Sequence, residues 1–161
     1  MFDIRKMQET VLFERIKAAA GEELAAAIVY EGGADSMDDA AWVNETMKRM
    51  EAAFDMQTLK RLRMGCQCGY GMDEKKTLVR ELTRSANNME DFAGSEKAHN
   101  AGLFTADGAL YLSFPFCPCP MLANVKRLDT KIWCYCTMGY SKELFEDVWG
   151  CEGEVDLLKS I

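Results

Sequence analysis

Apolar residues spaced three or four positions apart recur through the first half of the chain, a pattern that predicts amphipathic helices. One such stripe runs from Ile4 to Ile28 and is expected to end at Gly32-Gly33. Ser36 stands three residues before Asp39, which is a capping-box signature for a following helix. The clearest stripe of that helix consists of Val43, Met47, Met50 and Phe54.

Two more helices are predicted in the middle of the chain. A short one runs from about Asp55 to Arg63, and we assign its basic run, residues 60–63, to the solvated side of the helix end. The other runs from Asp73 to about Phe92. Its apolar face is made of Leu78, Leu82, Ala86 and Met89.

The pattern changes to short strands after residue 100. Residues 103–105 and 109–114 flank an Asp107-Gly108 turn and predict a β-hairpin. The three prolines of the chain all fall within residues 114–120, so this segment is expected to form a stiff loop. Alternation predicts strands at 131–136 and 154–158, and a helix over 139–148 that Thr137 could cap.

These elements predict an α+β fold, with a helical N-terminal half packed on a small antiparallel sheet in the C-terminal half. We expect this sheet to carry the last two cysteine pairs. A soft boundary is placed near residue 55, with a helical arm over 1–54 and a cysteine-rich body over 55–161. With 161 residues, the two parts can also form one continuous domain.

The charge of the chain narrows the partners that we expect. A net charge of −7 argues against nucleic acid and against anionic membrane surfaces, both of which need a basic face. The N-terminus shows no secretion signal, and the longest apolar run, residues 24–30, is too short to span a bilayer. We therefore expect a cytoplasmic protein whose cysteines stay reduced.

Six of the seven cysteines form three Cys-x-Cys pairs, which is the most informative chemical feature of the sequence. Side chains two residues apart in an extended segment point to the same side, so each pair can present two sulfurs to one target. Reduced, paired thiols are typical of zinc sites, and iron–sulfur clusters use the same ligands. The predicted metal ligands are Cys66, Cys68, Cys117, Cys119, Cys134 and Cys136.

Several alternatives remain open at the level of sequence. Cys136 would precede a helix N-terminus, where a lowered pKa would favour a thiol oxidoreductase using Cys134 and Cys136. The pairs could also simply pack in a core. His99 is the only histidine and lies in a polar, surface-like segment, while Cys151 is unpaired and treated as incidental.

Two kinds of partner are also considered. Aromatic side chains near the pairs could wall a pocket for a small molecule. The first helix, expected to be poorly tied to the body, could pair with its copy in a homodimer. The aromatic residues in question are Phe114, Phe116, Trp133, Tyr135 and Tyr140.

The segment from Trp133 to Glu146, followed by residues 155–161, resembles a family of uncharacterised bacterial proteins with a cysteine-rich C-terminal half. That family is distantly similar to 4-vinyl-reductase-like small-molecule-binding domains and to the L-2-amino-thiazoline-4-carboxylic acid hydrolase family. The resemblance implies an α+β ligand-binding fold and, as a further alternative, hydrolysis of a small amide or heterocycle. It also implies a metal site made of Cys117, Cys119, Cys134 and Cys136.

Overall fold

A computed structural model describes residues 3–160 of the chain and confirms the α+β class. Helices dominate, and the described residues contain one sheet, the antiparallel pair β1–β2. Ile161, the last residue of the resembling segment, lies outside the described part. In chain order the elements are α1 (Ile4–Ala20), α2 (Glu22–Val29), η1 (Ala34–Ser36), α3 (Asp39–Ala53), α4 (Met56–Met64), α5 (Met72–Ser85), α6 (Met89–Gly94), α7 (Glu96–Asn100), β1 (Leu103–Ala106), β2 (Ala109–Leu112), η2 (Pro120–Leu122), η3 (Ile132–Cys134) and α8 (Tyr135–Trp149).

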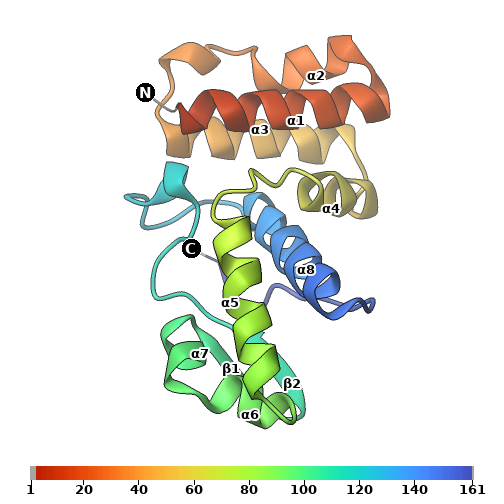
Figure 1. Ribbon diagram of the computed structural model, residues 1–161. Coiled ribbons are helices and arrows are strands. Elements are labelled where there is room, and N and C mark those ends of the chain that lie inside the picture. The colour runs from red at the N-terminus through yellow and green to blue at the C-terminus, as the bar shows by residue number, and fades with distance from the viewer. Residues whose placement is uncertain (1–2, 161) are drawn as a thin grey trace.

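Helices α1, α2 and α3 form a layer at one end of the molecule (Figure 1). The long N-terminal stripe is divided at Gly21, whose φ of 94° breaks the helix and lets α2 pack back on α1. Asp38 rather than Ser36 caps α3, by accepting the backbone N–H of Ala41 at 2.8 Å. The predicted capping box is therefore wrong, because Ser36 belongs to the preceding turn.

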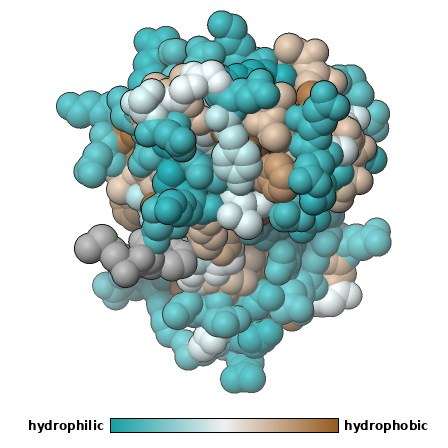
Figure 2. All heavy atoms as spheres, turned by 90° about the horizontal axis from the view of Figure 1, so that it is seen from above, coloured by the Kyte–Doolittle hydropathy of each residue, from teal (hydrophilic) through white to brown (hydrophobic). Residues whose placement is uncertain are grey.

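The first helix is tied firmly to the body, contrary to expectation. Leu12 and Ile16 are fully buried, and Arg5 bonds to Asp39 and to the carbonyl of Ala34. The apolar stripe of α1 is thus buried in the core of its own chain. Hydrophilic side chains cover most of the face seen from above this layer, with smaller apolar areas between them (Figure 2).

One core cluster joins the N-terminal helices to the C-terminal half. The predicted stripe of α3 is confirmed, since Val43, Met47 and Met50 are fully buried. Trp42 lies in the same core, and its ring meets that of Trp133 edge-on at a centroid distance of 5.5 Å. Residues from both halves of the sequence therefore share this core. A second cluster joins α5, α6, β1 and the end of α8.

The predicted hairpin is confirmed. Leu103 pairs with Leu112, and the turn residues Asp107 and Gly108 both have positive φ, as a tight turn of this kind requires. However, the two strands carry no cysteine, so the prediction that the sheet holds the last two pairs is wrong. The cysteines lie in loops and at a helix start instead.

Two predicted strands and one helix differ from the structure. Residues 131–136 are helical, because η3 runs directly into α8, and this lets Ile132, Trp133 and Tyr135 all bury. Residues 154–158 alternate in exposure but have no strand beside them to pair with. The helix predicted over 73–92 ends at Ser85, and Asn88 caps the separate helix α6.

Candidate functional site

The three cysteine pairs reach one region through three different segments. The first pair follows α4, the second lies in the proline-containing loop before η2, and the third begins α8 (Figure 1). Burial raises the pKa of the Cys136 thiol, and the charges of Cys68 and Cys66 raise it further, just as burial and then the charge of Cys136 raise the pKa of Cys119. Cys117 is coupled to Cys119 in the same way. Electrostatic interactions thus link five thiols that are up to 70 positions apart in the sequence.

Close packing of α4 on α8 brings the first and third pairs together. Gly139 of α8 touches the end of α4, and a Cβ built at this position would lie 1.9 Å from the carbonyl oxygen of Met64. The same carbonyl accepts a hydrogen bond from Gln67 Nε2 at 3.2 Å, which holds the first pair beside this contact. No side chain larger than hydrogen fits between the two helices here.

The helical start of α8 changes how the third pair can act. Residues two apart in a helix point about 200° away from each other, whereas in a strand they share a side. Cys134 ends η3 and Cys136 lies in the first turn of α8, so their side chains leave the helix in different directions, and Cys136 interacts with the first pair. Thr137 lies inside the first turn of α8 and is not its cap.

Several N–H groups surround the sulfur of Cys119. Burial raises the pKa of this thiol and the charge of Cys136 raises it further, whereas the backbone N–H groups of Met121 and Leu122 and the indole N–H of Trp133 lower it. The indole N–H has no partner with full hydrogen-bond geometry. Burial likewise raises the pKa of Cys117, and the backbone N–H of Cys119 lowers it. These donors would all stabilise negatively charged sulfur.

Arg63, near the end of α4, is fully buried. Its Nη2 donates to the carbonyl of Trp133 at 2.7 Å, and its guanidinium stacks on the Trp133 ring at 4.0 Å. Nε and Nη1 are buried without a partner of good geometry. Burial raises the pKa of the Cys66 and Cys136 thiols, and the charge of Arg63 opposes this increase in both.

The sequence interpretation missed Arg63, because it assigned the whole basic run to solvent. The signal was nevertheless present in the spacing. Leu59, Leu62 and Arg63 stand at positions i, i+3 and i+4, so they share one helix face, and all three are buried. An arginine on the apolar face of a helix is a cation that the fold must accommodate.

The raised pKa values bear on the predicted thiol chemistry. A lowered pKa was expected for Cys136, but burial raises it, so the thiol is protonated at neutral pH and is a weak nucleophile. Burial and the nearby Cys68 also raise the pKa of Tyr140 to about 12. His99 and Cys151 are exposed at the surface. The predicted surface position of His99 is confirmed.

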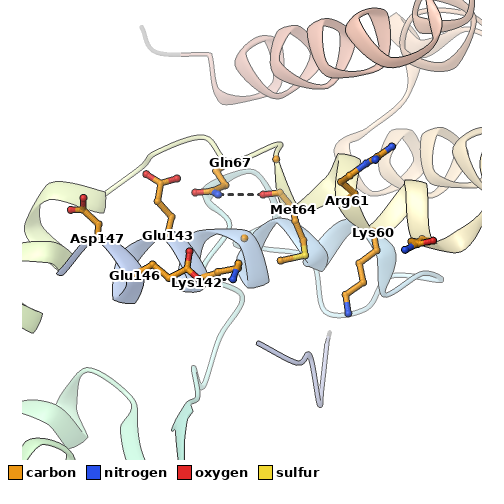
Figure 3. Close-up of a pocket in the computed structure, with 11 residues that line it drawn as sticks. Lys60, Arg61, Met64, Gln67, Lys142, Glu143, Glu146 and Asp147 are labelled. Carbon is orange, nitrogen blue, oxygen red and sulfur yellow. Dashed lines mark hydrogen bonds and ion pairs between the residues drawn. The ribbon is translucent and has the colours of Figure 1, made fainter. Parts of the chain in front are cut away.

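An open groove of about 690 Å³ lies beside the first cysteine pair, between α4 and α8. Figure 3 shows Lys60 and Arg61 at one end and Glu143 and Asp147 at the other, with Gln67 on the upper edge. The aromatic side chains proposed as pocket walls do not line it. Its charged lining is suited to a small polar molecule that carries both signs of charge.

Within residues 3–160, no three Cys, His, Asp or Glu side chains form a group that could hold a metal ion. In the same range, no helix combines the length and apolar character needed to cross a bilayer.

A family model of unknown function, DUF6144, matches residues 1–161. The chain belongs to this family. No curated protein and no solved structure matches it. The comparisons therefore give no support to the similarity with 4-vinyl-reductase-like domains or with the thiazoline-carboxylate hydrolase family. What this DUF6144 protein does must be argued from the site itself.

Proposed function

We propose that this DUF6144 protein binds a metal ion, zinc, through cysteine thiolates. The observation that carries the proposal is the convergence of thiols from three separate segments on a region rich in N–H donors and containing a buried arginine. Core cysteines that only fill space need neither the donors nor the cation. Thiolates bound to zinc use both, because each sulfur keeps negative charge.

The electrostatic contacts favour a particular set of four ligands. Cys136 interacts with Cys66, Cys68 and Cys119, so these four form the proposed tetrathiolate shell. This set differs from the one implied by resemblance, because it includes Cys66 and Cys68, which interact with Cys136. Cys117 stands next to the shell, with its sulfur near the N–H of Cys119.

Assembly of the shell requires rotation of the cysteine side chains toward a common centre. The thiols of Cys66, Cys119 and Cys136 are protonated in the metal-free protein because burial raises their pKa values. Zinc would displace these protons and convert the thiols to thiolates. Four cysteine ligands leave no open position, which is typical of a structural rather than a catalytic zinc site. Such a site suits a reducing compartment such as the cytoplasm.

Two alternatives to a zinc site are each supported by a specific feature of the chain. An iron–sulfur cluster would use the same thiolates and is separated from zinc by colour and by sulfide content. A small polar molecule could bind in the groove between α4 and α8, next to Gln67. A thiol oxidoreductase using Cys134 and Cys136 is less well supported, because a protonated Cys136 thiol reacts slowly.

The test is anaerobic purification of the full chain without chelator, followed by metal analysis and titration with Co²⁺. We expect one zinc per chain, no visible colour, and a Co²⁺ spectrum typical of tetrahedral thiolate ligation. Cys136→Ser should abolish binding, whereas Cys151→Ser serves as the control, because Cys151 is exposed and unpaired in sequence. Metal-free protein with seven titratable thiols that takes up neither Zn²⁺ nor Co²⁺ would disprove the proposal.

A further inference from the structure

The acidic end of the groove between α4 and α8 is already paired with cations. The ammonium of Lys76 on α5 lies 3.7 Å from a carboxylate oxygen of Glu143 and 3.3 Å from one of Asp147. Arg80, one turn further along α5, also lies 3.3 Å from Asp147. A ligand with a positive group would have to compete with these two side chains. The acidic end therefore offers little free charge to a ligand.

The basic end of the groove has no such compensation. Lys60 and Arg61 both line it, and none of the ion pairs among residues 3–160 includes either of them. Lys142, the other cation of the lining, is bonded to Glu146 and to the carbonyl of Gly153, each at 2.5 Å. The charge that remains available to a ligand is thus positive and comes from α4.

An apolar floor lies next to this charge. Met64 and the buried Gly139 line the groove, and Figure 3 shows Met64 between Lys60 and Lys142. Lys60 and Met64 stand at positions i and i+4 of α4, so they share a face of that helix. The volume of about 690 Å³ is that of a site for an organic molecule rather than for a bare ion.

We propose that the groove binds a small organic anion, a carboxylate or a phosphate monoester, with an apolar body. Lys60 and Arg61 leave α4 in different directions, as Figure 3 shows. The half-buried Lys60 donates to the anionic group, and the exposed Arg61 adds to the positive potential. The body of the ligand covers Met64 and Gly139.

This inference deepens the groove alternative given above and narrows its ligand to one whose binding charge is negative. It does not depend on the zinc site, because none of the cysteines that the structure describes lines the groove. The two proposals can therefore fail separately.

The test is titration of the full-length protein with phenyl phosphate and with benzoate, followed by NMR, with benzylamine as the charge-reversed probe. We expect saturable binding of at least one anion, with chemical-shift changes confined to α4 and α8, and no saturable binding of benzylamine. The ratio of the two Kd values distinguishes a phosphate ligand from a carboxylate ligand.

Lys60→Gln should raise the Kd for the anion about three- to tenfold, since a charge-assisted hydrogen bond is lost. Lys48→Gln is the matched control, because it removes the same charge from an exposed position on α3, outside the groove. Its Kd should stay within about twofold of the wild-type value. An equal Kd in the two variants would overturn the proposal.

Glu143→Gln tests the sign of the ligand from the opposite end of the groove. The Kd for the anion should fall about twofold, because one repulsive charge is removed. A higher Kd in Glu143→Gln, tighter binding of benzylamine than of phenyl phosphate, or no saturable binding of either anion would each overturn the anion site. None of these results would alter the zinc proposal, which is tested by metal uptake.

Discussion

Two arginines in this protein are packed alike but compensated differently. Arg5 stacks on Trp42 and Arg63 stacks on Trp133, at 4.3 and 4.0 Å. Each also donates to a backbone carbonyl, at 3.0 and 2.7 Å respectively. Arg5 in addition meets Glu9 at 2.6 Å and an α3 carboxylate at 3.0 Å, whereas Arg63 interacts with the thiols of Cys66 and Cys136.

This difference indicates that stacking and a carbonyl contact suffice to position a guanidinium but not to neutralise it. In the N-terminal layer, carboxylates on the same helix and on α3 supply the opposite charge. At the cysteine site the opposite charge is available only if the thiols lose protons. The comparison thus separates an arginine paired with two carboxylates from one whose Nε and Nη1 have no partner of good geometry.

The largest expected effect comes from removing the tryptophans under the two arginines. Trp42 and Trp133 are both almost fully buried, so Trp42→Ala and Trp133→Ala should each lower the free energy of unfolding by about 3–5 kcal/mol. Only Trp133→Ala should also weaken zinc binding, because it removes the support of Arg63 and the N–H near Cys119. Urea unfolding with and without zinc measures both quantities.

Equal losses of zinc affinity in the two tryptophan variants would contradict the distinction between the two regions. The milder pair Trp42→Phe and Trp133→Phe keeps aromatic stacking in both places. Of these, Trp133→Phe isolates the loss of the indole N–H beside Cys119.

An intermediate effect is expected at Gly139, which brings α8 and α4 together at the cysteine site. Gly139→Ala places a Cβ against the backbone of Met64, so the helices must separate. We expect a loss of about 1–3 kcal/mol in the free energy of unfolding, together with weaker zinc binding. Gly94→Ala is the control, because a Cβ meets nothing within 4 Å there. Unchanged zinc affinity in Gly139→Ala would show that the first and third pairs do not share a metal.

The smallest effect concerns the caps of the helices that carry Arg5 and Arg63. Asp3 caps α1 and Asp55 caps α4. The N–H and hydroxyl of Thr58 hold the pKa of Asp55 below its ordinary value of 3.8. Its contribution to stability is therefore present above that value and is lost as the pH falls through the lowered folded-state pKa.

Asp55→Asn tests this acid dependence in metal-free protein. Asparagine keeps an acceptor for the Thr58 N–H but has no charge that protonation could remove. The melting temperature of Asp55→Asn should therefore fall less steeply in acid than that of the wild type. Asp55→Ala should be less stable at every pH, because the cap itself is lost. If the melting temperatures of the wild type and Asp55→Asn fell in parallel as the pH is lowered, the acid dependence attributed to Asp55 would be contradicted.

Local patterns predicted much of the fold correctly. The stripe of α3 and the hairpin with its Asp107-Gly108 turn follow from spacing and turn chemistry that act over a few residues. The segment 131–136 was misassigned, since aromatic and β-branched residues favour a strand locally while burial of Ile132 and Trp133 in one core requires a helix. The α5 boundary was missed because Asn88 caps a new helix.

The sequence by itself determined the α+β class, the reactive residue types and their pairing along the chain. Only the tertiary structure decided which thiols face each other, because Cys136 and Cys134 diverge on a helix and Cys66 arrives from a distant loop. It also decided that Arg63 is buried without an anion. Spacing specifies what a short segment can present, whereas the charge environment of a buried group depends on every element packed around it.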